Sequence, residues 1–266
     1  MSASALILVG IIAGGGAGLL AGLIGIGGGI VIVPVIYFGL LHSGMSVDTA
    51  AHVAVATSLA AIVPTAIVSF LGHWRAGNTD IGFLRDWGPA IAVGVIVAQL
   101  AAPHVRGSLM SAAFGMLCIP FAVRFAAPHR FQPVVDQPPG GWFRQFAGIG
   151  IGATSGFAGI GGGILTNIVM TLSGLPMHKS IGRAAAAGVV VSIPATIVAL
   201  LASRTLDATG IGSVDIVLWA CIAPAQAVGA WFGAQLASGI AAENLSRLLS
   251  IALGFTGVTM LYSSVM

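Results

Sequence analysis

Charged residues are what this sequence has least of. Of its 266 residues, ten are Lys or Arg and seven are Asp or Glu, so 6% of the chain is charged and 57% is hydrophobic. An ordinary soluble domain carries about 25% charged residues. So few charges cannot cover a globule with a hydrated surface, which argues against a soluble enzyme, a nucleic-acid-binding domain, a disordered chain and a coiled coil. The composition predicts an integral membrane protein, with the lipid bilayer as its first partner.

Groups that carry chemistry are scarce as well. The two cysteines, Cys118 and Cys221, stand in apolar stretches and are typical of small packing residues, not of a disulfide or metal site. No acidic residue stands inside an apolar run, and His and Cys lack metal-ligand spacing. The net charge of +3 comes from scattered basic residues, which is typical of orientation charge at a membrane and not of nucleic-acid binding. We therefore expect no enzyme activity, catalytic residue, metal or cofactor.

The gaps between charges divide the chain into hydrophobic segments. Eight stretches lack Asp, Glu, Lys and Arg: 1–47, 49–74, 87–105, 107–123, 145–178, 184–203, 216–242 and 248–266. A helix needs about 20 apolar residues to cross the hydrocarbon core of a bilayer, and six of the eight stretches fit one crossing each. A chain in lipid must satisfy its own backbone hydrogen bonds, and no strand-like alternation is present. These segments are therefore expected to be helices.

Two of the stretches contain a glycine cluster. Stretches 1–47 and 145–178 are too long for one crossing, and their interiors hold Gly25–Gly29 and Gly159–Gly163. Each glycine costs a helix roughly 1 kcal/mol relative to alanine, so we expect both helices to break there. The clusters stand 134 residues apart in matching sequence, which indicates an internal repeat.

The repeat covers the whole chain. Pro64 matches Pro194, 130 residues later, in similar sequence. One copy of about four hydrophobic segments is then expected in residues 1–127 and the other in 143–266, joined by the polar linker 128–142.

The distribution of basic residues bears on how the copies are oriented. If each broken segment returns to the side it came from, the copies are inverted. The basic residues then divide eight against two, with only Arg106 and Arg204 in the minority. Parallel copies give six against four. Because positive residues gather on the cytoplasmic side, the first division is favoured. The predicted fold is an all-α polytopic membrane protein built from two inverted repeats, whose first and fifth segments break at glycines.

The glycine breaks are the first part of a candidate substrate site. A helix that restarts inside the membrane presents free N–H groups and the positive end of its dipole, so two such ends can cradle an anion. The alternative is that the glycines only allow close helix packing. A dinucleotide-binding fingerprint fails because Ile stands at 30 and 164, and no Lys-Ser or Lys-Thr pair completes a P-loop. The glycines are Gly25, Gly27, Gly28, Gly29, Gly159, Gly161, Gly162 and Gly163.

Six polar side chains in or beside the apolar runs complete the candidate substrate site. They are Thr166, Asn167, Arg183, His52, Thr57 and Ser58. Arg183 either pairs with the anion or anchors a helix at the interface. The hydroxyls either bind substrate or bond back to their own helix carbonyls. His52 either carries a proton for coupling or is an interfacial histidine with satisfied hydrogen bonds.

Several of these motifs together resemble a known family. In the first half they are Gly25–Pro34, His52–Leu59 and His73–Asn78, and in the second Gly159–Leu165 and Pro176–Gly182. The sequence resembles the TauE/SafE sulfite exporter family, also called the toluene-sulfonate uptake permease group, over nearly its whole length. Two features depart from the pattern. Arg183-Ala184 stands where the family usually has Thr-Ser, and Thr166-Asn167 stands where the first half has Ile32-Val33.

The resemblance implies a function. It points to a secondary transporter, with export as the expected direction, for a small sulfur oxyanion or organosulfonate such as sulfite. Transport of another small anion and an anion channel stay as alternatives. A multi-pass protein of the inner (plasma) membrane is expected, and the sequence leaves a homodimer open.

Overall fold

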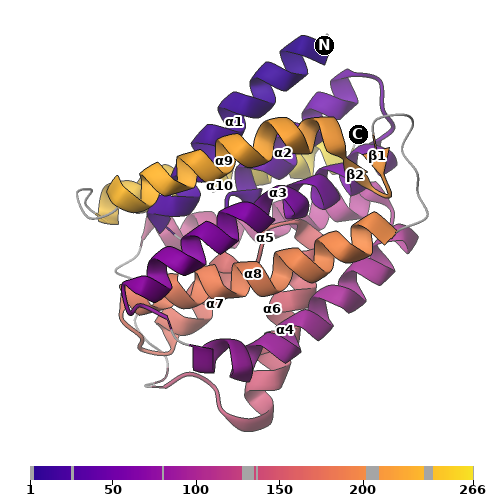
Figure 1. The fold of residues 1–266 in the computed structure, drawn as a ribbon. Coiled ribbons are helices and arrows are strands. Elements are labelled where there is room, and N and C mark those ends of the chain that lie inside the picture. The colour runs from indigo at the N-terminus through magenta and orange to yellow at the C-terminus, as the bar shows by residue number, and fades with distance from the viewer. Residues whose placement is uncertain are drawn as a thin grey trace.

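The computed structural model describes residues 3–24, 27–79, 81–127, 135, 137–201, 210–236 and 242–265. Within these residues the chain is a bundle of ten α-helices with one small hairpin (Figure 1). The first predicted copy contains α1 (Ala3–Ile24), α2 (Gly29–His42), α3 (Val47–Arg75), α4 (Ile81–Ala101), the 3-10 turn η1 (Ala102–His104) and α5 (Gly107–Ala126). The second contains α6 (Gly141–Ala158), α7 (Gly163–Leu172), α8 (Met177–Leu201), β1 (Gly210–Ile211), β2 (Val214–Asp215), α9 (Ile216–Leu236) and α10 (Ala242–Val265).

The helices are those of a polytopic membrane protein. Among the described residues, five are long and apolar enough to cross a bilayer: α3, α4, α5, α8 and α9. This confirms the predicted all-α membrane fold. Prolines such as Pro64 and Pro194 stand inside these helices, which is tolerated in membrane helices because neighbouring groups satisfy the freed carbonyls.

Both glycine clusters interrupt a helix, as the sequence predicts. The first segment ends as a helix at Ile24 and restarts at Gly29, and the fifth ends at Ala158 and restarts at Gly163. The residue before each restart, Gly28 or Gly162, has a left-handed backbone with φ of 72° or 77°. Glycine adopts this conformation without the steric cost of a Cβ atom, which allows the chain to bend at these two positions.

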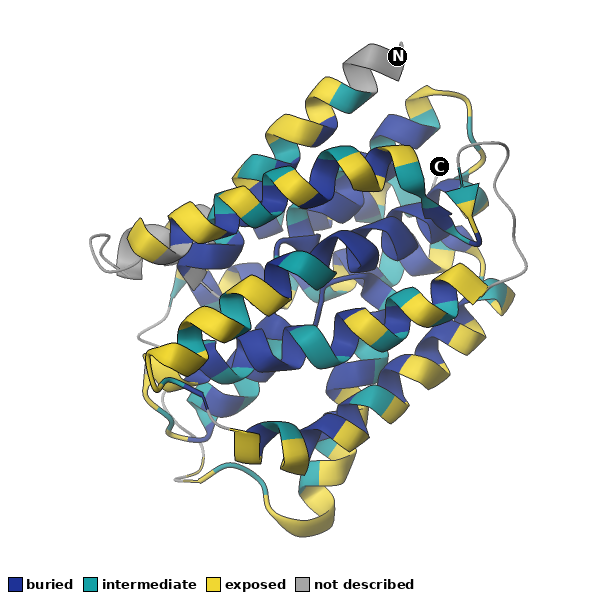
Figure 2. Ribbon diagram, in the orientation of Figure 1, coloured by how far each residue is buried: buried dark blue, intermediate teal, exposed yellow. Residues whose placement is uncertain are grey.

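Helix α3 lies at the centre of the bundle, and α8 packs along it in the opposite direction. Every residue from 50 to 62 is buried, and Figure 2 shows the middle of α3 in dark blue. Ala60 clusters with Ala199 near the end of α8. At the other end of the pair, Gly182 lies against the backbone of Asn78, just after α3. The two helices are therefore antiparallel.

The outer helices pack in two similar pairs, α1 with α9 and α4 with α6. In each pair a glycine lies against the backbone of its partner, Gly18 against Gln226 and Gly152 against Ile91, so that a Cβ atom would clash. Small residues let membrane helices approach this closely. The pairs join a broken segment of one predicted copy to the fourth helix of the other.

Helices α5 and α10 also run antiparallel. Ser250, near the start of α10, donates a 2.8 Å hydrogen bond to the carbonyl of Ala122, near the end of α5. Gly115, near the middle of α5, lies against Leu261, near the end of α10. Inverted copies require both antiparallel pairs, α3 with α8 and α5 with α10. Most of the predicted linker, together with Gly25, Arg130 and Arg204, lies outside the described residues.

Candidate functional site

The two helix breaks contact each other in the middle of the bundle. A Cβ atom on Gly29 would clash with the carbonyl oxygen of Gly159, and one on Gly27 would lie 3.6 Å from the carbonyl oxygen of Ile160. Because Gly29 and Gly159 belong to different breaks, two segments that are 130 positions apart in the sequence lie in contact. The fold thus brings together the glycines that the sequence singles out as a pair.

Side chains from neighbouring helices hold the broken backbone in place. The hydroxyl of Ser58 on α3 donates a 3.1 Å hydrogen bond to the carbonyl of Gly159. The amide of Gln226 on α9 donates a 3.0 Å hydrogen bond to the carbonyl of Gly27. Breaking a helix leaves carbonyls without intrahelical partners, and these two side chains satisfy one in each break. Ser58 is therefore bonded to backbone, and the adjacent Thr57 accepts a 3.0 Å hydrogen bond from the amide of Asp215.

A small cavity lies beside the breaks, and we call it the central cavity. Its volume is about 10 Å³. Its lining consists of Ala21, Gly27, Thr65, Ala66, Ser69, Gly161, Gly163, Ala184, Ala185 and Gly188. A cavity of about 10–15 Å³ holds one water molecule, so the helices around the central cavity are almost closed on each other. None of these lining residues is charged.

The ends of two helices border the central cavity. Helix α7 begins at the lining residue Gly163, and α2 begins two residues after the lining residue Gly27. At the start of α2, the amides of Val31 and Ile32 donate to the carbonyl of Gly28, at 3.1 Å and 3.2 Å. The first amides of a helix have no partner within the helix and carry the positive end of its dipole. We therefore expect the two helix starts to make the border of this uncharged cavity electropositive.

Two hydroxyls line the central cavity, and the sequence does not single out either of them. Thr65 donates a long 3.4 Å hydrogen bond to the carbonyl of Ala61. The Oγ atom of Ser69 is buried and has no hydrogen-bond partner among the described residues. Both stand one helical turn apart on one face of α3, a spacing visible in sequence, but only the packing of α8 shows which face is internal.

The two polar residues after the second break are deeply buried. Thr166 is 0% exposed and Asn167 is 3% exposed. Among the described residues, the hydroxyl of Thr166 and the amide nitrogen of Asn167 have no hydrogen-bond partner. They stand in the first turn of α7, outside the lining of the central cavity.

Arg183 lies in the second turn of α8, next to the lining residue Ala184. Its Nη1 atom is 3.6 Å from the sulfur of Met170, and its guanidinium carbon is 5.7 Å from the ring centroid of Phe83. A guanidinium over an aromatic face is an attractive cation–π arrangement. Arg183 is therefore close to the central cavity along the chain but is not part of its lining.

His52 lies in a separate cavity, which we call the His52 cavity. It has a volume of about 20 Å³ and lies between α3, η1 and the end of α8. The ring atoms Nδ1 and Nε2 lie 2.6 Å and 2.8 Å from the carbonyl oxygens of Asp48 and Ala102. In the same lining, the amide of Gln99 donates a 2.7 Å hydrogen bond to the carbonyl of Gly156. His52 therefore does not meet the glycines of the central cavity.

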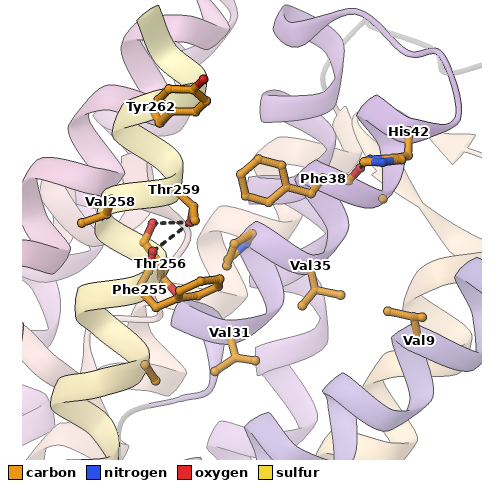
Figure 3. Close-up of a pocket in the computed structure, with 13 residues that line it drawn as sticks. Val9, Val31, Val35, Phe38, His42, Phe255, Thr256, Val258, Thr259 and Tyr262 are labelled. Atoms are coloured by element: carbon orange, nitrogen blue, oxygen red, sulfur yellow. Dashed lines mark hydrogen bonds between the residues drawn. The ribbon is translucent and has the colours of Figure 1, made fainter. Parts of the chain in front are cut away.

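Another hollow, among the described residues, has a different character. It is a groove whose lining is mostly hydrophobic, where Val31, Val35 and Phe38 of α2 face Phe255 and Tyr262 of α10 (Figure 3). The lining contains no Lys or Arg, and its only polar side chains are those of His42, Thr256, Thr259 and Tyr262, so the groove is a poor candidate for an anion site. Across the described parts of the chain, no three His, Cys, Asp or Glu side chains gather as metal ligands.

Comparison with known proteins gives the family. The model of the family described as sulfite exporter TauE/SafE matches residues 10–260. A probable membrane transporter protein of Haemophilus influenzae is 31% identical over 187 residues, which are 70% of this chain and 71% of that protein. One of Methanocaldococcus jannaschii is 26% identical over 96% of this chain and 94% of its own length. The probable membrane transporter protein YunE of Bacillus subtilis is 27% identical over 100% of this chain and 99% of its own. No solved structure matches the chain. The match of the family model over almost the full length shows that the chain belongs to the TauE/SafE sulfite exporter family.

Proposed function

We propose that this membrane transporter is a secondary transporter, acting as an exporter, of a small sulfur oxyanion or organosulfonate such as sulfite. The substrate binds at the central cavity, between the restarts of α2 and α7, when the helices that line the cavity move apart. The observation that carries the proposal is the lining of that cavity by Gly27, Gly161 and Gly163 from both breaks. The description of the family as sulfite exporters supports the class of substrate.

The physical basis is electrostatic. Helix starts place unpaired N–H groups and positive dipole ends near the cavity, which favours a negative solute. Glycine and alanine lining lets oxyanion oxygens approach the backbone, and the hydroxyls of Thr65 and Ser69 add donors. No acidic side chain stands in this lining to repel an anion. Discontinuous helices whose starts face an anionic substrate are a recurring design of secondary transporters.

The placement of basic residues supports an orientation in the inner membrane. Of the ten basic residues, eight are described, and seven of these stand on helix ends that share one side of the bundle. They are Arg75, Arg85, Arg124, Arg144, Lys179, Arg183 and Arg247. Contacts such as the 2.7 Å ion pair between Arg144 and Asp86 join these ends. The positive-inside rule assigns this side to the cytoplasm.

Transport by the purified protein in liposomes tests the proposal. We expect sulfite to accumulate with saturating kinetics and to be displaced by short sulfonates but not by an organic cation of similar size. In detergent, sulfite should raise the unfolding temperature, because a ligand that binds only the folded state stabilises it. Flux that does not saturate would instead indicate a channel. Absence of both flux and thermal stabilisation for every sulfur oxyanion would refute the substrate class.

A further inference from the structure

The central cavity and the His52 cavity lie along the same interface between α3 and α8. On α3 the His52 cavity ends at Ala56 and the central cavity begins at Thr65. On α8 the order is reversed, with the central cavity at residues 184–188 and the His52 cavity at 198–199. Because the helices are antiparallel, the cavities occupy opposite halves of one interface. Residues 57–64 of α3 and 189–197 of α8 separate them, and we call this part of the interface the barrier.

Ile62 forms the α3 side of this barrier. It is 0% exposed and lies on the same helical face as Ala66 and Ser69, at spacings of four and seven residues. A Cβ atom on Gly161 would lie 3.1 Å from both Cδ1 and Cγ2 of Ile62, and one on Gly29 would lie 3.0 Å from Cδ1. The side chain therefore fills the space between the two glycine breaks and contacts both of them.

The matching position in the second predicted copy carries a different residue. Ser192 stands 130 residues after Ile62, the same spacing that relates Pro64 to Pro194. It is also 0% exposed, and its hydroxyl has no hydrogen-bond partner among the described residues. The barrier thus contains an apolar side chain, Ile62, at one of the two matching positions and a polar side chain, Ser192, at the other. An isoleucine repels a charged solute and excludes it by volume, whereas a free hydroxyl offers it a donor.

We propose that Ile62 separates the two cavities and sets the largest anion that crosses between the glycine breaks. The inference rests on the proposed function and adds a specificity-determining residue to it. An anion moving from one cavity to the other must pass the side chain of Ile62, because the backbone of both breaks contacts it. Shortening this side chain widens the passage without removing any hydrogen bond.

The test compares fluxes of a small and a large anion through purified protein in liposomes. Sulfite and benzenesulfonate serve as the pair, with wild type, Ile62→Val, Ile62→Ala and Val53→Ala. Val53 is the matched control, because it is also buried on α3 but stands nine residues from Ile62, on the opposite helical face, and lines neither cavity. One methylene in an apolar pocket changes discrimination by roughly tenfold or more. We expect the benzenesulfonate-to-sulfite ratio to rise about tenfold in Ile62→Val, further in Ile62→Ala, and to stay at the wild-type value in Val53→Ala.

A second measurement is independent of which anion is transported. Ala66→Cys places a thiol in the central cavity, in a background where Cys118 and Cys221 are replaced by alanine. An anionic methanethiosulfonate reagent, added from the side of the His52 cavity, should label this thiol several-fold faster when Ile62→Ala is also present.

The outcomes separate the inference from the proposed function. If wild type carries no sulfite yet Ile62→Ala accelerates labelling, the barrier stands and the substrate class fails. An unchanged flux ratio in Ile62→Val together with an unchanged labelling rate would overturn the role of Ile62. Should Ile62→Ala fail to reach the membrane, the conservative valine variant decides both measurements.

Discussion

Replacing Ser69 by alanine should weaken anion binding without destabilising the empty protein. The Ser69 hydroxyl is buried in the lining of the central cavity, and no described residue accepts or donates a hydrogen bond to it. A buried polar group without a partner costs about 1–3 kcal/mol. Ser69→Ala removes that cost along with the oxygen atom, so the free energy of unfolding should stay the same or rise.

The same substitution should weaken the binding of sulfite, although it does not destabilise the empty protein. If Ser69 donates to a bound anion, the lost hydrogen bond to a charged group is worth about 1.5–3 kcal/mol. That corresponds to a Kd for sulfite raised roughly 10- to 150-fold. At a sulfite concentration one hundred times the wild-type Kd, ligand stabilisation of about 2.7 kcal/mol would fall to about 1.4 kcal/mol for a tenfold weaker variant.

Thermal unfolding with and without sulfite measures both quantities on one sample. Ser111→Ala is the matched control, because this buried serine on α5 bonds the carbonyl of Gly107, 3.0 Å away, and lines no part of the central cavity. It should lose some stability and keep the wild-type sulfite shift. A Ser69→Ala protein with an unchanged sulfite shift would refute the assignment of this hydroxyl to substrate and reduce it to a packing residue.

Three further predictions concern the breaks and the orientation of the helices. Gly162→Ala places a side chain on a left-handed backbone, which costs about 1–2 kcal/mol even without a clash. Chemical denaturation should therefore show a free energy of unfolding that is lower by at least this amount. Ser58→Ala leaves the carbonyl of Gly159 without its donor and should lower the free energy of unfolding by about 1–3 kcal/mol; a neutral result would mean that water replaces the hydroxyl. Single cysteines at Ser43 and Gly174, each in the loop after the second half of a broken segment, should react with impermeant reagents from opposite sides of the membrane. Labelling from the same side would exclude inverted copies.

Local chemistry made the membrane fold and the helix breaks predictable. Scarce charge requires burial in lipid, and Gly27 and Gly28 allow a left-handed turn, although three consecutive glycines at 14–16 stay helical within α1. The hydroxyls of the central cavity were not predictable in the same way. Thr65 and Ser69 look like ordinary helix residues until α8 packs on their face of α3, which is a contact between residues more than a hundred positions apart.

Arg183 illustrates the opposite difficulty. The sequence places this arginine at the end of an apolar run, which favours the interpretation that it pairs with an anion. In the structure, however, the side chain of Arg183 extends toward Met170 and Phe83. The direction of a long side chain depends on the neighbouring helices, α4 and α7 here, and not on its own sequence. The sequence does not single out Ile62, because an isoleucine in an apolar run is ordinary. Only the fold shows that its side chain lies between the two glycine breaks.

The predicted copies share their glycines but not their polar groups. Thr65 and Ser69 correspond by the 130-residue spacing to Ala195 and Ala199, while Thr166 and Asn167 correspond by the 134-residue spacing to Ile32 and Val33. The hydroxyls of the central cavity therefore come from the first copy, and the buried polar pair beside the breaks from the second. A symmetric backbone can offer an anion the same amides from both sides, but it cannot replace a donor that only one copy has. Loss of Ser69 should consequently not be compensated by any side chain at the matching position, whereas the backbone amides of either break remain when one of them is perturbed.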